Sequence, residues 1–292
     1  MRVRMVPLSD LPRVATEEWV DPGRRPVVRD GVAYVPVREG ESHEMEIPER
    51  RLYHGRGYQL LGDLVLLHGH RPAPGEVEEI EEWVHPRGIL WIRAISGIER
   101  VPAVEVISGT AGEVCHHEYG CSFVLDPARV MYSMGNLSER HRLVDLAGKG
   151  AGTGRVGDLF AGIGYFTIPL ARAGFRVHAM EISPVSFGYL GRNIRGNGVE
   201  DRVLAECGDC RDLLRGTYDR LLLGHFDAPG YLPDALAHAR SGTVLHVHTL
   251  RDEAERIRSL AREAGFAASV TTRRVKSYAP HTWHRVQDVV LA

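Results

Sequence analysis

Short apolar runs alternate with amphipathic segments along the second half of the chain. A polar-led helix is predicted over 138–147. The strands predicted after it are 155–160, 175–180, 202–206, 219–224 and 242–248, and the helices between them are 164–173, 184–197, 231–240 and 251–264. Two long strands, about 267–276 and 284–291, follow and are joined by Ser277–His281. The alternation predicts an α/β fold with a mostly parallel sheet, and the last two strands should form an antiparallel hairpin.

The first half of the chain has a weaker and more mixed pattern. Residues 1–50 are rich in Arg, Glu and Pro, and predict a small N-terminal unit with a strand at 32–37. An α+β module is expected over 51–130, with a helix from Pro74 that places Val77, Ile80 and Val84 on one face. Its expected strands are 64–67, 90–95, 103–107 and 123–127. The α/β domain then occupies 131–292.

The composition limits the class of protein without identifying its function. The chain has 292 residues, 43% hydrophobic and 25% charged, with a net charge of -2. These values are typical of a globular protein and give no bulk attraction to nucleic acid. No apolar run is long enough for a bilayer, and the first residues lack a signal-peptide pattern. We therefore expect a cytoplasmic protein that does not contact membranes.

Four cysteines are too few for a disulfide scaffold in a chain of this length. Cys207 and Cys210 form one Cys-x-x-Cys, which would suit a redox pair, half of a zinc site, or two small residues in a loop. Because no second pair has metal-ligand spacing, we favour the last interpretation and expect no metal.

The segment Asp158–Gly164 predicts a turn between a strand and a helix, and suggests a nucleoside ligand. Gly162 and Gly164 let a ligand approach the backbone, and Glu181 ends the next strand, where it can accept both hydroxyls of a ribose. A dinucleotide fingerprint is incomplete, since Phe160 stands where its first glycine belongs. Asp158 would repel a pyrophosphate but suits a cation.

A third carboxylate, Asp209, follows the next strand and can accept a hydrogen bond from an adenine amine. The three acids fall at strand ends, where ligands bind in such sheets. They indicate S-adenosylmethionine, a cation without phosphate, and with the terminal hairpin they indicate a class I methyltransferase-type, Rossmann-like sheet. The competing interpretation is that acidic residues cap helices at strand ends.

Seven motifs together resemble a known family over roughly 51–292. They are His116–Glu118, Val130–Asn136, Glu139-Arg140, Asp158–Pro169, Glu181, Gly208-Asp209 and Lys276–His284. The chain resembles the tRNA wybutosine-synthesising aminocarboxypropyl transferases of archaeal type, which are related to the tRNA guanosine-37 N1-methyltransferases. The resemblance implies that Ser133 and Arg140 place the methionine moiety of the cofactor. It also implies that Glu181 holds the ribose, and that Asp209, with Cys210 beside it, holds the adenine side.

The implied activity is transfer of the 3-amino-3-carboxypropyl group of S-adenosylmethionine to carbon 7 of 4-demethylwyosine at position 37 of tRNA-Phe, releasing methylthioadenosine. Ser133 and Arg140 would orient the donor arm, and we assign no catalytic acid or base. The alternative is a tRNA guanosine-37 N1-methyltransferase. That branch carries an Asn-Pro-Pro motif after the fourth strand, whereas this chain has Leu221–Asp227 without it. His225 in this stretch contacts the substrate base or is structural.

The implied partner is tRNA-Phe, bound by a monomer whose N-terminal parts dock the RNA by analogy with the family. The sequence offers local basic clusters for phosphates and aromatic residues for an unstacked base. The basic clusters are Arg24-Arg25, Arg50-Arg51, Arg211 with Arg215, and Arg273-Arg274 with Lys276, and the aromatic candidates are Tyr165, Phe226, Tyr278 and Trp283. A small-molecule methyltransferase and a non-enzymatic RNA-binding module are the more distant alternatives.

Overall fold

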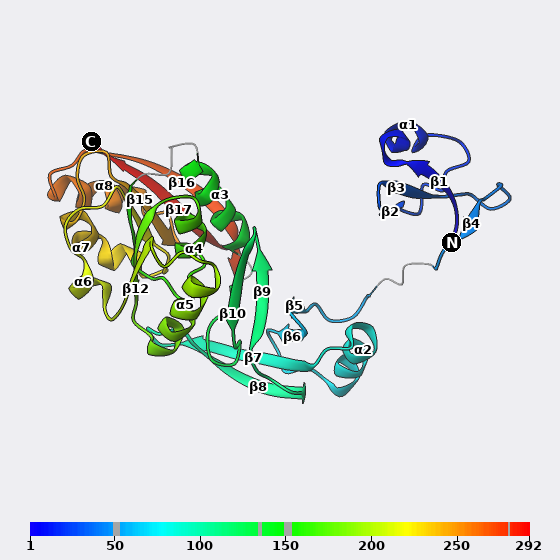
Figure 1. Cartoon of the computed structure of the whole chain (residues 1–292), viewed down its shortest axis with the longest axis horizontal. Helices are drawn as coiled ribbons and strands as arrows, with labels where there is room; N and C mark the ends of the chain where they lie inside the picture. The colour runs from blue at the N-terminus through cyan, green and yellow to red at the C-terminus, as the bar shows by residue number, and fades with distance from the viewer. Residues whose placement is uncertain (49–52, 134–135, 149–153, 280) are drawn as a thin grey trace. The chain divides into compact units, whose positions relative to one another are not determined.

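The computed structural model describes residues 1–48, 53–133, 136–148, 154–279 and 281–292. The chain forms two compact units, Met1–Gly55 and Arg56–Ala292, and each is taken by itself. The expected boundary between residues 50 and 51 lies outside the described residues. Figure 1 labels the helices and strands of both units.

The N-terminal unit is a small antiparallel sheet with one short helix. The strands stand in the order β2-β3-β1-β4, and their bounds are β1 Arg2–Pro7, β2 Val27–Arg29, β3 Val32–Pro36 and β4 Met45–Glu46. A single 3-10 turn, η1 (Leu8–Asp10), leads into α1 (Leu11–Val14). Val14, Val20, Ala33 and Val35 form the apolar centre of the unit. The predicted strand at 32–37 is thus β3.

The second unit begins with a four-stranded sheet in the order β5-β6-β7-β8. The strands are β5 Gln59–Leu61, β6 Leu64–Leu67, β7 Gly88–Ser96 and β8 Val101–Gly109, and the helix α2 spans Pro74–Val84. β6 and β7 are parallel, so α2 serves as the crossover between them. The tip of the β7–β8 hairpin carries Gly97 and Arg100 in the left-handed region, at φ 71° and 56°.

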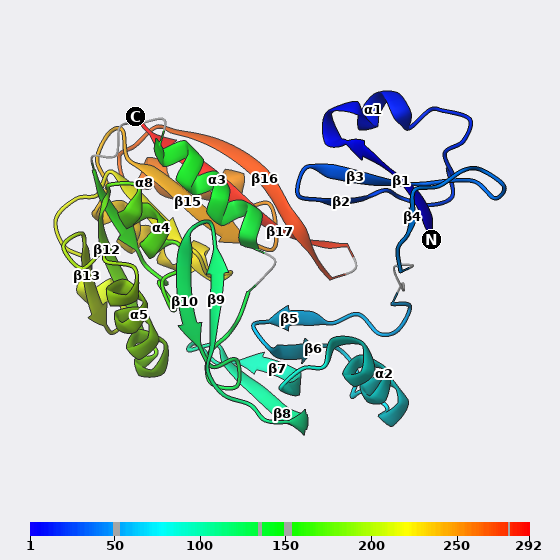
Figure 2. The ribbon, with the colours of Figure 1, turned by 45° about the vertical axis from the view of Figure 1, so that its right-hand side comes forward.

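A second hairpin, β9 (Val114–Glu118) and β10 (Cys121–Leu125), packs against the helix α5 (Pro184–Gly196). Asn193 Oδ1 accepts the main-chain N–H of Val124 at 2.7 Å, and Asn197 Oδ1 accepts that of Ser122 at 2.9 Å. Figure 2 shows this hairpin between the sheet of β5–β8 and the sheet that contains β12 and β15. The sequence pattern did not predict β9, and the expected domain boundary near residue 130 stays a prediction.

The large sheet has seven strands in the order β13-β12-β11-β14-β15-β17-β16. Its strands are β11 Arg155–Asp158, β12 Arg176–Glu181, β13 Val203–Cys207, β14 Arg220–Leu223, β15 Val244–Thr249, β16 Ala268–Ala279 and β17 Thr282–Leu291. The first five in spatial order are parallel, and β17 runs antiparallel to both β15 and β16. This arrangement confirms the predicted fold class.

Short helices connect these strands on the two faces of the sheet (Figure 1). They are α3 Leu137–Gly148, α4 Thr167–Arg172, α6 Cys210–Leu213, η3 Ala228–Tyr231, α7 Leu232–Ala237 and α8 Ala254–Glu263, in addition to α5. Two apolar clusters form the core, one joining α4 and α5 to β11 and β12, the other joining α7 and α8 to β14 and β15. No helix among the described residues is long and apolar enough to cross a membrane.

Two predicted boundaries are wrong for identifiable reasons. The predicted loop Ser277–His281 is mostly strand, because β16 continues to Ala279 and Ser277 pairs with Trp283 across the hairpin. The helix predicted from residue 164 begins at Thr167, since Gly164 has φ 103° and cannot be helical.

Candidate functional site

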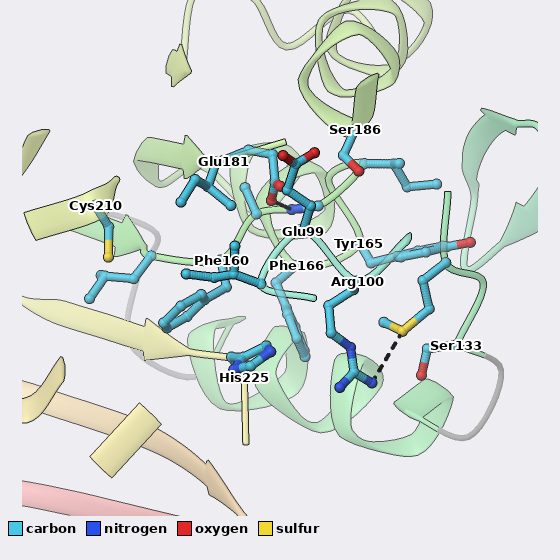
Figure 3. A pocket seen from close by; sticks show the side chains of 18 of the residues that line it. Glu99, Arg100, Ser133, Phe160, Tyr165, Phe166, Glu181, Ser186, Cys210 and His225 are labelled. Atoms are coloured by element: carbon cyan, nitrogen blue, oxygen red, sulfur yellow. Dashed lines mark hydrogen bonds between the residues drawn. The ribbon is translucent and has the colours of Figure 1, made fainter. Parts of the chain in front are cut away.

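A pocket lies at the carboxyl edge of the parallel strands, the edge at which α/β sheets bind ligands (Figure 3). We call it the strand-end pocket. It is lined by the turn after β11, the ends of β12, β13 and β14, the tip of the β7–β8 hairpin and the segment before α3. The helices α3 and α5 and the 3-10 turn η3 each add one residue. About 1010 Å³ of empty space lies in it and in its open mouth.

Glu181 joins the end of β12 to the glycine turn. One carboxylate oxygen accepts the N–H of Gly162 at 2.7 Å and the other accepts the N–H of Ser183 at 2.9 Å. Burial raises the pKa of Glu181 and the two backbone N–H groups oppose that rise. Gly162 has φ 57°, and nothing lies within 4 Å of where a Cβ would stand. Both residues line the strand-end pocket, as predicted for a cofactor that approaches the turn.

Asp158 and Gly164 are not among the residues that line the strand-end pocket, and their predicted contact with the cofactor stays a prediction. Asp158 is fully buried, and one of its oxygens accepts a hydrogen bond from the Thr167 hydroxyl at 2.7 Å, which ties β11 to α4. Burial raises the pKa of Asp158 to about 6. A Cβ on Gly164 would stand 2.8 Å from Cδ1 of Ile168, so this glycine permits close packing. A strand-end position did not reveal that both residues face the core.

Asp209 and Cys210 line the pocket at the start of α6. The Asp209 carboxylate accepts the backbone N–H of Arg211 at 3.0 Å and forms an ion pair with its guanidinium. Cys210 is buried, and burial raises the pKa of its thiol to about 12, so the thiol is neutral. Cys207 is exposed and all four cysteines are free; Cys207 ends β13 and Cys210 begins α6, so the pair spans a strand-to-helix turn and does not lie within a loop as predicted. Among the described residues no cluster of His, Cys, Asp and Glu could hold a metal ion.

Arg140 is buried and already has an anionic partner. Its Nη1 donates to both carboxylate oxygens of Glu118 at 2.8 Å, and its Nη2 donates to the carbonyl of Ser133. The guanidinium also stands 3.6 Å from the ring centroid of Tyr165. His116 bonds to Glu118 at 3.2 Å, which explains the His116–Glu118 motif as the support of this arginine. Ser133 and Arg140 both line the pocket, while residues 134–135 of the same motif lie outside the described residues.

His225 enters the pocket from the end of β14. Its Nδ1 accepts the N–H of Asp227 at 3.2 Å, and its ring stacks on Phe160 with centroids 5.4 Å apart. Burial lowers the pKa of His225, so the ring is neutral at neutral pH. Because Nδ1 accepts a hydrogen bond, the ring proton sits on Nε2, which is buried and lacks a partner among the described residues. The Nε2–H of His225 is therefore an uncommitted donor in the pocket wall.

The aromatic residues predicted to stack on the substrate base do not all come together at the pocket. Tyr165 lines the pocket and is almost buried. Phe226 lies between Tyr278 and His284, with ring centroids 5.2 and 5.1 Å away. Trp283 instead pairs with the guanidinium of Arg274. Of the basic clusters, Arg50-Arg51 lies outside the described residues.

Sequence reasoning missed the contribution of the β7–β8 hairpin, whose tip residues Ile98, Glu99 and Arg100 line the pocket. No motif marks them, and they lie more than fifty residues before the glycine turn. The carboxylate of Glu99 adds to burial in raising the pKa of Glu181, so the two acids are close. Figure 3 shows Glu99 and Arg100 projecting among the side chains that come from the large sheet.

The sheet order and the pocket at its carboxyl edge define a protein of the class I methyltransferase type. A family model described as the TRM5/TYW2 methyltransferase domain matches residues 114–275. This chain belongs to that family.

Among curated proteins, this chain is similar to a tRNA(Phe) (4-demethylwyosine(37)-C(7)) aminocarboxypropyltransferase of Methanocaldococcus jannaschii. The two are 34% identical over 80% of this chain and 97% of that protein. Among solved structures, M. jannaschii TYW2 in complex with AdoMet is 28% identical, with a TM-score of 0.63 over 80% of this chain and 98% of that one. Trm5b of Pyrococcus abyssi is 25% identical, with a TM-score of 0.76 over 99% of both chains.

Proposed function

We propose that this protein transfers the 3-amino-3-carboxypropyl group from S-adenosylmethionine to carbon 7 of 4-demethylwyosine at position 37 of tRNA-Phe. The observation that carries the proposal is the pocket wall after β14. There Gly224 and His225 line the cavity, where an N1-methyltransferase is expected to carry Asn-Pro-Pro. The wall next to the reacting groups therefore differs from that of a guanosine methyltransferase. The names of the curated relatives agree with this assignment.

The pocket residues fit this cofactor. Gly162 leaves open space beside a turn, Glu181 offers a carboxylate to ribose hydroxyls, and Asp209 and Cys210 flank the site for adenine. Phe160 and Tyr231, which also line the pocket, pack edge to face with ring centroids 5.0 Å apart and give it an apolar aromatic surface. Bound adenosylmethionine supplies carbons activated by a sulfonium, and attack on its γ-carbon moves the aminocarboxypropyl group and releases methylthioadenosine.

The role we propose for the protein is orientation and exclusion of water. The Glu118–Arg140 pair fixes the backbone of Ser133, so this side of the pocket is held rigidly for the donor arm. Fixing two reactants in this way contributes up to about 7–11 kcal/mol in favourable cases. The Nε2–H of His225 is a neutral donor for a carbonyl or ring nitrogen of the acceptor base. No charged acid or base is required of the chain.

A tRNA guanosine-37 N1-methyltransferase is the second candidate, and one observation favours it. The likeness to Trm5b extends over 99% of this chain and so includes the N-terminal unit, whereas the likeness to M. jannaschii TYW2 extends over 80% of this chain. A tRNA partner suits both candidates. We propose that the module of residues 51–130 docks the tRNA, and that the protein acts as a cytoplasmic monomer without a metal.

The nucleoside product separates the candidates. The protein is incubated with adenosylmethionine and with tRNA from a strain that lacks the activity, and the nucleosides are then analysed by mass. We expect an aminocarboxypropyl adduct of 4-demethylwyosine together with methylthioadenosine. A methylguanosine with adenosylhomocysteine would refute the proposal in favour of the methyltransferase.

A further inference from the structure

The outer face of the β9–β10 hairpin carries a cysteine, a histidine and a serine in contact with one another. Alternate side chains of a strand face opposite sides, so Cys115 and His117 share the exposed face of β9. The Sγ of Cys115 lies 3.6 Å from Nε2 of His117, and the Oγ of Ser122 lies 2.9 Å from Nδ1 of the same ring. None of the three lines the strand-end pocket. We call this group the hairpin thiol cluster.

Packing against α5 fixes the serine of the hairpin thiol cluster. Asn197 Oδ1 accepts the main-chain N–H of Ser122 at 2.9 Å, and its Nδ2 donates to the Ser122 carbonyl at 2.7 Å. A hydroxyl accepts hydrogen bonds as well as donating them, so Ser122 can receive the Nδ1–H of His117. The Nε2 of His117 is then left to take the proton of the Cys115 thiol. A nucleophile, a base and a third group that orients the base form the arrangement by which proteins activate a thiol.

The other three cysteines lack this arrangement. Cys121 and Cys210 are buried, and burial raises the pKa of both thiols, that of Cys210 to about 12. Cys207 is exposed as Cys115 is, yet no side chain among the described residues hydrogen-bonds to its thiol. Because the thiolate and not the thiol is the nucleophile, Cys115 is the cysteine best placed to react at neutral pH.

A metal ion is the competing occupant of a cysteine-histidine pair. Protein zinc sites use three or four protein ligands. Across the part of the chain that the structure describes, no group of three His, Cys, Asp or Glu side chains could hold a metal ion. A small electrophile, by contrast, needs only the thiol and its base.

We propose that Cys115 is a modification site that forms mixed disulfides with low-molecular-weight disulfides, with His117 as its base. The Sγ of Cys115 attacks one sulfur of the disulfide while His117 takes the thiol proton. A sulfur–sulfur bond to Cys115 forms, the original sulfur–sulfur bond breaks, and the leaving thiolate recovers the proton from His117. The small disulfide is itself the oxidant, since one of its halves leaves as a reduced thiol. The site does not depend on the proposed transferase reaction, because it lies outside the pocket.

Modification by glutathione disulfide, resolved by cysteine, tests the proposal. The full chain is incubated with an excess of this disulfide and quenched with acid, and the initial rate at each cysteine is read from peptide masses. At pH 7 we expect Cys115 to react about 10- to 30-fold faster than Cys207, because a free thiol is only a few per cent ionised there and full removal of its proton gains no more. At pH 9 an ordinary thiol is mostly ionised, so the two rates should agree within about threefold.

Substitutions in the hairpin thiol cluster separate the base from mere exposure. His117→Gln should bring the rate at Cys115 at pH 7 to within about threefold of the rate at Cys207, and Ser122→Ala should lower it by less. His70→Gln is the matched control, since His70 is an exposed histidine of the same unit whose ion pair is with Glu76. It should leave the rate at Cys115 unchanged. Thermal unfolding like that of wild type, followed by circular dichroism, shows that each variant is folded.

Three results would overturn the proposal. One is an equal rate at Cys115 and Cys207 in the wild-type protein at pH 7. Another is an unchanged rate at Cys115 in folded His117→Gln. The third is a preference for Cys115 that is as large at pH 9 as at pH 7, because access to the sulfur and not a base would then explain it.

Discussion

Substitution of Gly164 by alanine should destabilise the large domain while sparing the cofactor pocket. Gly164 has φ 103°, where an L-residue is strained by about 1–2 kcal/mol or more. Its new Cβ would stand 2.8 Å from Cδ1 of Ile168 and 3.0 Å from Cδ1 of Leu190. Both neighbours are fully buried, so the overpacking adds about 1–3 kcal/mol. The expected loss in the free energy of unfolding is therefore about 2–5 kcal/mol.

Urea unfolding followed by far-ultraviolet circular dichroism measures this loss. Gly188→Ala is the control, because Gly188 lies in α5 with nothing within 4 Å of its Cβ position. In a helix interior alanine is favoured over glycine by about 0.5–1 kcal/mol, so the control should gain slightly. Gly164→Ala should still bind adenosylmethionine normally when folded, since Gly164 does not line the pocket. A loss below about 1 kcal/mol, or a selective loss of binding, would refute the assignment of Gly164 to packing.

Three further predictions concern buried charges. Burial raises the pKa of Asp158 to about 6 from an ordinary 3.8. The protonated side chain therefore contributes fully to the free energy of unfolding below pH 3.8, and this contribution is lost as the pH rises through 6. In urea unfolding, the free energy of unfolding of Asp158→Asn should match that of wild type near pH 4 and exceed it by about 1–3 kcal/mol at pH 8. A variant that is less stable than wild type at pH 8 contradicts this. Arg140→Met removes the arginine partner of the buried Glu118 carboxylate and should lower the free energy of unfolding by about 3–5 kcal/mol. Adding Glu118→Gln should restore part of this stability, and no restoration in urea unfolding would argue against the pair. Glu181→Gln should weaken adenosylmethionine binding about 10- to 100-fold in calorimetry, because the ribose loses a charged acceptor, and an unchanged affinity would exclude that role.

The succession of strands and helices in the large domain could be predicted because the local hydrophobic pattern of each segment indicates its secondary structure. Leu221–Leu223 of β14 are buried, as are the consecutive residues Val177–Glu181 of β12, and unbroken buried runs of this kind are typical of central parallel strands. The closing hairpin followed from two long strand-like stretches joined by a short connection. β9 escaped prediction because Val114–Glu118 is polar and exposed on alternate residues, and it is stabilised mainly by pairing with β10.

The site could be predicted in part for the same reason. Strand ends at one edge of a parallel sheet meet in space, which brought together Gly162, Glu181, Asp209 and Cys210. The direction of a side chain at a strand end depends on its neighbours, and Asp158 turned toward Thr167 in the core.

The sequence by itself determined the type of sheet, the edge at which a ligand binds and the cofactor that its acids suit, because the positions of the strands and of their ends follow from short-range periodicity. Only the tertiary structure decided which charges are already paired. It joined Arg140 to Glu118, put the proton of His225 on Nε2, and brought Arg100 from a distant hairpin into the pocket. These pairings arise between segments far apart in the chain, where burial and long-range packing, and not local propensity, set the energy.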